Sequence, residues 1–150
     1  GRHLQLKSSL LTTLFRLPAL RRDEESAYKR AADLMEYVGC GEYVGAEASA
    51  MSYGALKRLE IARALAAEPK VILLDEPAAG LNAVETAALE DLIRKIADQG
   101  TTVMLVEHDM KLVMGISDRL LVLNYGRVLA EGTPEEIRQN PDVIAAYLGG

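Results

Sequence analysis

Three side chains suited to phosphate chemistry follow two apolar runs of the sequence. Asp75 and Glu76 follow the run 71–74, and His108 comes shortly after the run 101–106. One carboxylate can orient a magnesium ion through its waters, a second can polarise an attacking water, and an imidazole can contact a terminal phosphate. These residue types fit phosphoryl transfer if a nucleotide binds nearby. Each also has an ordinary role, because acidic pairs begin turns and a lone histidine is often structural.

A candidate anion site lies earlier in the chain, at the start of a segment with helical periodicity. Ser52 stands where a helix N-cap belongs, and Gly54 follows two residues later. The first turn of such a helix presents free backbone amides beside a hydroxyl, which favours anion binding. An ordinary capped helix over 51–67 explains the same residues, so this segment alone does not decide the function.

The two apolar runs must form neighbouring strands for the acidic pair and the histidine to meet. The run 71–77 is too short for an ordinary helix, and we expect a strand that is buried on both faces. A helix starting at Asn82, with Glu85 at capping-box spacing, leads to a second buried strand at 101–106. Strand, helix and strand make a crossover with parallel strands. The acidic pair and the histidine should therefore open into one crevice, where open α/β sheets bind ligands.

Local signals predict the remaining elements. An amphipathic helix is expected over 4–15 and ends at Pro18, and a second helix with apolar positions from Ala27 to Val38 ends near Gly39. The other expected elements are a loop over 39–50, a hairpin over 119–131, a capping box over 133–136 and a last short helix from Asn140.

The composition is that of a soluble globular domain. The chain has 150 residues, of which 49% are hydrophobic and 26% charged, so it can bury a sizeable core. A formal charge of −5 gives no reason to expect attraction to nucleic acid. No stretch reaches the roughly 18 apolar residues of a membrane-spanning helix. The single Cys40 cannot form an internal disulfide, is expected to be a small apolar filler, and is compatible with a reducing compartment.

The order of the motifs resembles that of the ABC ATPases, and the resemblance covers nearly the whole chain. The matching segments are 51–55 with 63–65 for the signature motif and its helix, 73–77 for the Walker B strand, 79–82 for the D-loop and 106–109 for the switch-histidine loop. The fold class that this implies is α/β, the C-terminal part of a P-loop NTPase core with parallel strands, preceded by part of a helical subdomain.

The resemblance implies ATP and Mg²⁺ as cofactors. By its motif position, Glu76 would be the general base for ATP hydrolysis, Asp75 would help to hold the magnesium ion, and His108 would sense the γ-phosphate. In a head-to-tail dimer, the signature residues would contact the ATP of the opposite subunit, and the D-loop would lie near the dimer seam. The residues concerned are Ser52, Tyr53, Gly54 and Ala55 of the signature and Asn82 of the D-loop.

Within that family, Tyr53, the run 78–82 and the run 132–149 look like the branched-chain amino acid importer ATPases. This implies a cytoplasmic ATPase, peripheral on the inner face of the cell membrane, that binds transmembrane permease subunits and a second ATPase subunit. A solute-binding protein would be an indirect partner, and nucleic acid would not be one. Urea and amide importer ATPases are similar, a non-catalytic truncated module is the alternative from another class, and soluble ABC proteins are a third.

The same resemblance divides the chain into three parts. Residues 1–50 would be part of the helical subdomain, residues 51–131 would hold the signature helix and the C-terminal half of the nucleotide-binding core, and residues 132–150 would form a helical tail. The sequence departs from the family at Met51, where Leu is usual, at Ala55 and Leu56, where glutamines are common, and at Asn82, where many members have Asp.

The largest departure is the missing phosphate loop. No G-x-x-x-x-G-K-[ST] occurs in the sequence, so no segment is available to cradle the α- and β-phosphates. The chain also begins at Gly1 without an initiator Met, and we expect it to be the C-terminal portion of an ABC ATPase. By itself it is expected neither to bind ATP tightly nor to hydrolyse it, and its strand at 101–106 is expected to keep an unpaired edge.

Overall fold

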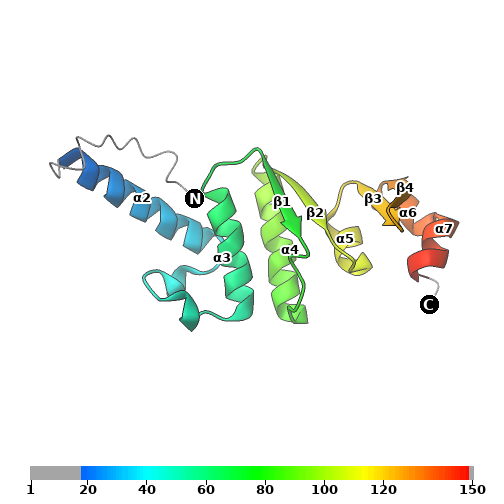
Figure 1. The fold of residues 1–150 in the computed structure, drawn as a ribbon, viewed down its shortest axis with the longest axis horizontal. Coiled ribbons are helices and arrows are strands. Elements are labelled where there is room, and N and C mark those ends of the chain that lie inside the picture. Colours follow the sequence, from blue (N-terminus) through cyan, green and yellow to red (C-terminus); the bar gives the residue numbers. More distant parts are fainter. Residues whose placement is uncertain (1–17, 149–150) are drawn as a thin grey trace. The chain divides into compact units, whose positions relative to one another are not determined.

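The computed structural model describes residues 18–148 as an α/β chain with two compact units. Among these residues, the first unit runs to Leu73 and includes Gly80–Met104, and the second comprises Leu74–Ala79 and the chain from Leu105 onward. The helix expected over 4–15 lies outside the described residues. Figure 1 shows the elements, which in chain order are α2 (Pro18–Tyr37), η1 (Gly41–Tyr43), η2 (Ala48–Ala50), α3 (Tyr53–Leu65), β1 (Val71–Asp75), α4 (Ala83–Asp98), β2 (Thr102–Val106), α5 (Met110–Ile116), β3 (Leu120–Asn124), β4 (Arg127–Gly132), α6 (Pro134–Gln139), α7 (Pro141–Val143) and the π-helical turn η3 (Ile144–Leu148).

The core of the first unit is centred on helix α4. Its apolar stripe is buried as predicted, and each such side chain contributes about 1.5–3 kcal/mol when it is fully removed from water. Helix α3 adds Ile61 and Ala62 to the buried set, and β1 adds Ile72. The buried residues of α4 are Leu89, Leu92, Ile93 and Ile96. This packing gives the first turns of α3 and α4, which carry candidate site residues, a rigid support.

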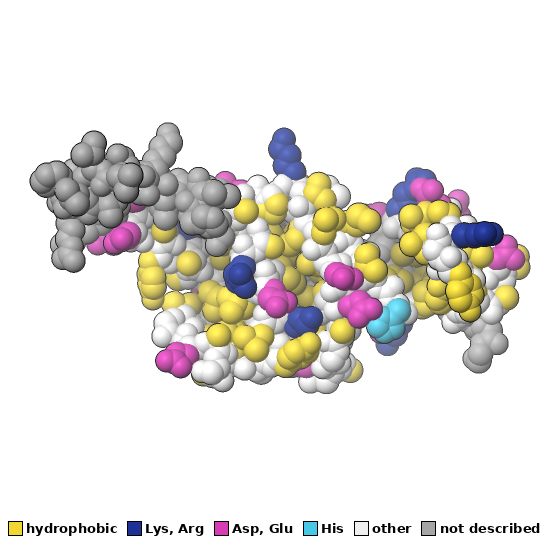
Figure 2. All heavy atoms as spheres, in the orientation of Figure 1, with side chains coloured by type: hydrophobic (Ala, Val, Ile, Leu, Met, Phe, Trp, Pro, Cys, Tyr) yellow, Lys and Arg dark blue, Asp and Glu magenta, His cyan; other side chains and the backbone are white. Residues whose placement is uncertain are grey.

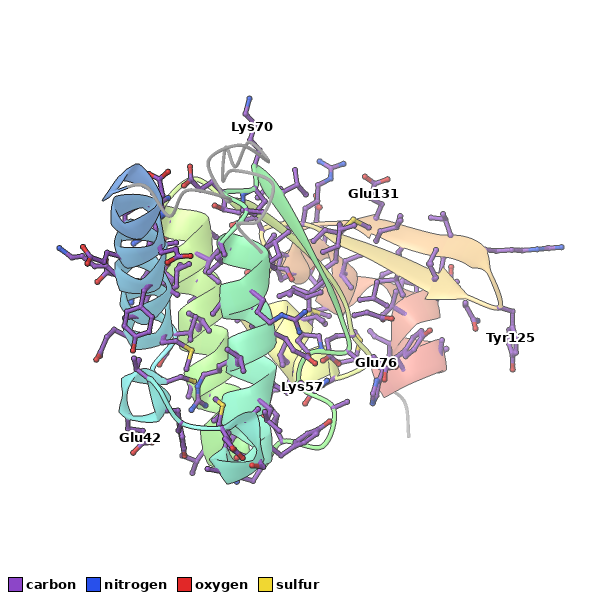
Figure 3. All side chains as sticks on the ribbon, turned by 60° about the vertical axis from the view of Figure 1, so that its left-hand side comes forward. Glu42, Lys57, Lys70, Glu76, Tyr125 and Glu131 are labelled. Carbon is purple, nitrogen blue, oxygen red and sulfur yellow. The ribbon has the colours of Figure 1, made fainter. Side chains whose placement is uncertain are left out.

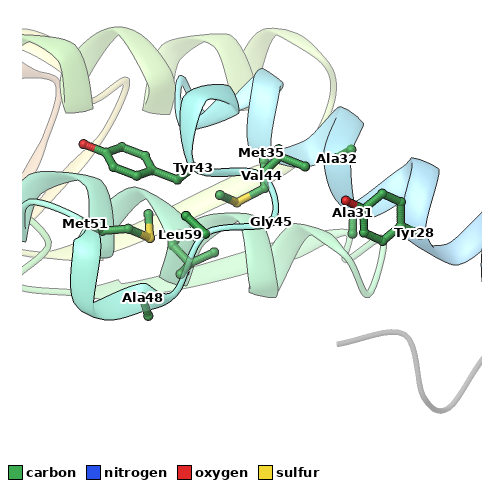
Figure 4. A pocket seen from close by; sticks show the side chains of 11 residues that line it. Tyr28, Ala31, Ala32, Met35, Tyr43, Val44, Gly45, Ala48, Met51 and Leu59 are labelled. Carbon is green, nitrogen blue, oxygen red and sulfur yellow. The ribbon is translucent and has the colours of Figure 1, made fainter.

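The end of helix α2 and the segment that follows it pack on α3. Gly39 has a φ of +72°, a left-handed conformation that suits the predicted helix end. Cys40 is fully buried, as expected of an apolar filler. The predicted loop over 39–50 contains the two short 3₁₀ turns η1 and η2. Leu59 of α3 and Met35 of α2 help to line an apolar hollow of about 230 Å³, shown in Figure 4.

Lys95 joins α4 to the end of α2. Lys95 Nζ lies 3.9 Å from the centroid of the Tyr37 ring and donates a hydrogen bond of 3.1 Å to the Tyr37 carbonyl oxygen. The Tyr37 hydroxyl is buried and has no hydrogen-bond partner within the described part of the chain. Desolvation raises the pKa of this hydroxyl. The contact holds the C-terminal end of α2 against α4.

Strands β1 and β2 form a parallel pair, as predicted. Thr102 N donates to Lys70 O at 2.9 Å, and Glu76 N donates to Val106 O at 2.9 Å, so the residue numbers rise together along both strands. Within residues 18–148 these strands make a sheet of only two, and β2 therefore keeps the unpaired edge that was expected.

The prediction that both strands are buried on both faces is wrong. Ile72 is buried, but the side chains on the other face of β1 are open, with Val71 53% and Leu73 72% exposed. Strand β2 exposes Met104 and Val106 in the same way. The reason is that no element of the described residues covers that face, so a continuous apolar run alternates between buried and exposed positions.

The second unit contains the predicted hairpin and its helical tail. Strands β3 and β4 are antiparallel, with a register shift between Val122 and Leu123. The turn residues Tyr125 and Gly126 have φ values of 47° and 74°, as a tight two-residue hairpin loop requires, and Tyr125 projects from the tip in Figure 3. Thr133 makes the predicted capping box at the start of α6, and Asn140 caps α7. Tyr147 Oη donates to Leu123 O at 2.5 Å.

Candidate functional site

The second unit brings Glu76 and His108 together, as the crossover predicted. His108 Nδ1 lies 3.6 Å from Glu76 Oε1, which is too long for a good hydrogen bond but close enough for both groups to act on one bound molecule. The Glu76 side chain is 56% exposed and the His108 side chain 74% exposed, and Figure 2 shows the imidazole in cyan at the surface. Both groups are therefore accessible to a ligand from solvent.

The backbone of Glu76 is in a left-handed conformation, with a φ of 42°. Such a conformation costs a non-glycine residue about 1–2 kcal/mol and occurs often at functional sites. Two hydrogen bonds hold it: Glu76 N donates to Val106 O at 2.9 Å, and Glu76 O accepts from Ala79 N at 3.1 Å. The backbone of the turn after β1 therefore sets the direction of the Glu76 side chain. Glu76 is labelled in Figure 3.

Glu107 is a site residue that sequence reasoning missed. Its side chain is only 1% exposed, and its carboxylate accepts hydrogen bonds from Ala78 N at 2.9 Å and from His108 N at 3.2 Å. It thus joins the turn after β1 to the loop after β2. The residue types give no signal for it, because the run 103–106 is apolar at every position. Only the structure shows the alternation in which Val103 and Leu105 are more buried than Met104 and Val106, and which Glu107 continues.

Asp75 ends β1 and is exposed. Its carboxylate is a hard oxygen donor, and Mg²⁺ in phosphate sites commonly takes one or two carboxylates beside waters and phosphate oxygens. Residues 18–148 contain no group of three or more His, Cys, Asp or Glu side chains arranged to hold a metal ion alone. A magnesium-binding role for Asp75 stays a prediction, in which it supplies one carboxylate beside a bound nucleotide.

The residues that the resemblance assigns to the signature motif lie at the start of helix α3 in the first unit. Ser52 is the N-cap, as predicted, and its Oγ accepts a hydrogen bond from Ala55 N at 3.2 Å. Ser52 and Tyr53 are exposed, whereas Gly54 and Ala55 are buried. The backbone amides in the first turn of a helix have no intrahelical acceptor, so this turn can offer N–H groups to an anion.

Asn82 is the N-cap of helix α4 and forms the predicted capping box. Asn82 Oδ1 accepts from Val84 N at 2.9 Å and from Glu85 N at 3.0 Å, while Glu85 Oε2 accepts from Asn82 N at 3.0 Å. The side chain of Asn82 is thus already engaged within the chain. Its expected place near a dimer seam stays a prediction.

Two substitutions of Ser52 separate its role as a helix cap from its proposed contact with phosphate. Replacing Ser52 with Ala removes the cap and should lower the free energy of unfolding by about 0.5–2 kcal/mol. Replacing it with Asp keeps a capping oxygen, so stability should be retained. In a longer polypeptide that also contains a phosphate loop, the added negative charge should oppose phosphate binding at this turn and slow ATP hydrolysis. Urea unfolding and phosphate release by that polypeptide measure the two effects. An unchanged hydrolysis rate in Ser52→Asp would contradict a phosphate contact and leave only the cap.

The fold defines the class of the protein. The model matches a crystal structure of the ADP conformation of an ATP-binding cassette of an ABC transporter with a TM-score of 0.77 and 27% identity, over 99% of this chain and 60% of that one. A nucleotide-free ATP-binding cassette from an ABC transporter matches with a TM-score of 0.76 and 26% identity, over the same shares. The chain is therefore part of an ABC ATPase cassette of the P-loop NTPase class.

The sequence comparisons show the family. The sequence model of the ABC transporter family matches residues 3–79, and that of the branched-chain amino acid ATP-binding cassette transporters matches residues 127–150. The chain belongs to the ABC transporter family. Within the part of the chain that the structure describes, no helix is long and apolar enough to cross a membrane.

The curated relatives are longer than this chain. The high-affinity branched-chain amino acid transport ATP-binding protein LivG of Salmonella typhimurium is 53% identical over 99% of the chain, which spans 59% of that protein. BraF of Pseudomonas aeruginosa, with the same description, is 50% identical over the same shares. LptB of Escherichia coli, the ATP-binding protein of a lipopolysaccharide export system, is 37% identical over 85% of the chain and 54% of its own length.

Proposed function

We propose that this chain supplies the signature, Walker B, D-loop and switch-histidine segments of the ATPase subunit of a branched-chain amino acid importer. The observation that carries this proposal is the 53% identity to LivG over 99% of the chain. The match of residues 127–150 to the branched-chain amino acid cassette family supports it at the C-terminal end. The subunit would bind transmembrane permease subunits at the inner face of the membrane, with a solute-binding protein as an indirect partner.

The chain's own residues divide the work of hydrolysis. Glu76, aimed by its left-handed backbone, accepts a proton from the attacking water, and His108 beside it contacts the terminal phosphate. Asp75 would hold the magnesium ion, which would supply charge neutralisation at the phosphates when bound. In a head-to-tail pair of subunits, the first turn of α3 offers backbone N–H groups to the γ-phosphate on the opposite subunit.

The activity belongs to a polypeptide that also contains a phosphate loop. The sequence of this chain has no G-x-x-x-x-G-K-[ST], so it lacks the backbone amides and the lysine that hold the α-, β- and γ-phosphates in this class. We therefore expect the 150-residue chain alone to show neither tight ATP binding nor steady-state hydrolysis.

A chimera tests the proposed function. In the LivG chimera, this chain replaces the matching residues of E. coli LivG, which is 52% identical to it. In a strain without LivG, the chimera should restore energy-dependent uptake of labelled leucine. The control carries the corresponding segment of LptB and should not restore uptake. A LivG chimera that assembles with the permease subunits but leaves uptake at the background level would contradict the proposal.

A further inference from the structure

The signature turn and the D-loop are in direct contact within the first unit. Gly80 has a φ of +78°, and a Cβ placed on it would lie 3.1 Å from Cε1 of Tyr53 and 3.7 Å from its Oη. The aromatic ring therefore lies against the backbone of Gly80, although Tyr53 as a whole is 52% exposed to solvent. Any larger residue at position 80 would push this ring away.

A second contact joins the same two segments through Glu85. A Cβ placed on Gly54 would lie 2.5 Å from Glu85 Oε1, so the carboxylate occupies the space beside the Gly54 backbone. The other oxygen of that carboxylate, Oε2, accepts from Asn82 N at 3.0 Å. Glu85 thus touches the second residue of α3 while it closes the capping box of α4. Because it is held at Asn82, it cannot move freely away from Gly54.

These contacts connect two segments that have separate tasks in the proposed function. The first turn of α3 is the element that would meet a phosphate on the opposite subunit. The D-loop is the segment that follows the Glu76 turn along the chain. A ring against one backbone and a carboxylate against the other leave the two turns little freedom to move independently.

We propose that Tyr53 and Glu85 are positioning residues that make the signature turn and the D-loop move as one body. Tyr53 does so through its ring, which covers Gly80, and Glu85 does so through its carboxylate, which fills the space between Gly54 and Asn82. Neither side chain needs to touch nucleotide for this role. The inference rests on the proposed function only for its effect on hydrolysis, because the contacts exist without nucleotide.

Hydrogen–deuterium exchange in the nucleotide-free LivG chimera tests the coupling without relying on activity. Tyr53→Ala removes the ring, and amide exchange over 80–85 should become about three- to tenfold faster, as expected when a stabilising aromatic contact is lost. Tyr53→Phe keeps the ring and should behave like the wild type. Exchange in the β3–β4 hairpin should be the same in all three proteins, which shows that any change is local.

Substitutions at Gly54 and Glu85 test whether the Glu85 carboxylate links the two turns. Gly54→Ala should accelerate exchange over 80–85, because the new methyl group displaces the Glu85 carboxylate from Asn82. In Glu85→Ala, where the carboxylate is already absent, adding Gly54→Ala should cause no further acceleration. Two independent, additive effects at these positions would overturn the role of Glu85, since they would show that the residues do not act through each other.

The ATPase readout separates positioning from binding. In Tyr53→Ala, kcat should fall while KM for ATP stays unchanged, and Tyr53→Phe should restore kcat. Unchanged exchange over 80–85 in an active Tyr53→Ala protein would overturn the inference. Accelerated exchange in a chimera whose wild-type form neither hydrolyses ATP nor imports leucine would support the coupling and contradict the proposed function instead.

Discussion

Replacing Glu76 with Gln in the LivG chimera is expected to slow ATP hydrolysis by about 10²–10⁴-fold, the usual contribution of a positioned general base. Glutamine has nearly the same shape, but it has no carboxylate to accept a proton from the attacking water. The fold should be retained, because the backbone bonds of Glu76 to Val106 and Ala79 do not involve its side chain. Phosphate release at saturating ATP measures the rate.

A matched control separates the loss of the base from the loss of one negative charge. Glu135 is exposed in the first turn of α6 and belongs to none of the proposed site segments. Glu135→Gln makes the same chemical change and should leave the rate unchanged. Glu76→Gln should still bind ATP in a nucleotide titration. A Glu76→Gln protein that keeps more than about a tenth of the wild-type rate would show that another group accepts the proton.

The features that the sequence predicts correctly are those decided within a few residues. The Ser52 cap, the box of Asn82 with Glu85 and the box of Thr133 with Glu136 each form between positions two or three apart. Such bonds depend on local side-chain types and helix geometry, so the pattern of residues is enough to place them.

Pairing of the two strands was also predictable, although it links distant residues. An apolar run, a helix with a clean stripe and a second apolar run can pack compactly only as a parallel crossover. That rule places the ends of β1 and β2 side by side, and with them Glu76 and His108. The prediction works because chain connectivity leaves few alternatives, not because the residues themselves identify a site.

Burial of the strands could not be predicted in the same way. A run such as 71–74 is apolar at every position, so it carries no alternation to show which face is covered. Val71 and Leu73 are open because the described residues place nothing over them, while Ile72 is buried.

The backbone of Glu76 and the role of Glu107 are tertiary features with no local signature. A φ of 42° at Glu76 is held by a bond from its amide to Val106, thirty positions along the chain. The carboxylate of Glu107 is paired with Ala78, at a separation of 29 residues. Nothing in the types of these residues distinguishes them from the other acidic residues, so only the fold identifies them.

Glu107 carries the second large prediction. Replacing it with Ala leaves Ala78 N and His108 N without their acceptor in a site where the Glu107 side chain is 1% exposed. A donor that loses its partner away from water costs about 1–3 kcal/mol. The bond from Ala78 N is part-buried and the bond from His108 N is exposed, so the free energy of unfolding should fall by about 1 kcal/mol, the low end of that range. The hydrolysis rate should fall as well, because the turn that aims Glu76 and the loop that carries His108 are no longer held together.

Glu107→Gln separates this positioning role from a general loss of packing. Its amide oxygen can still accept from Ala78 N, but its NH₂ group is a second donor facing His108 N. Stability measured by urea unfolding should therefore lie between those of the wild type and Glu107→Ala, and kcat should recover in part while KM for ATP is the same in all three. If Glu107→Ala unfolds at the wild-type urea concentration and keeps the wild-type kcat, the carboxylate does not hold the site, and the strained Glu76 backbone must be maintained by its own hydrogen bonds alone.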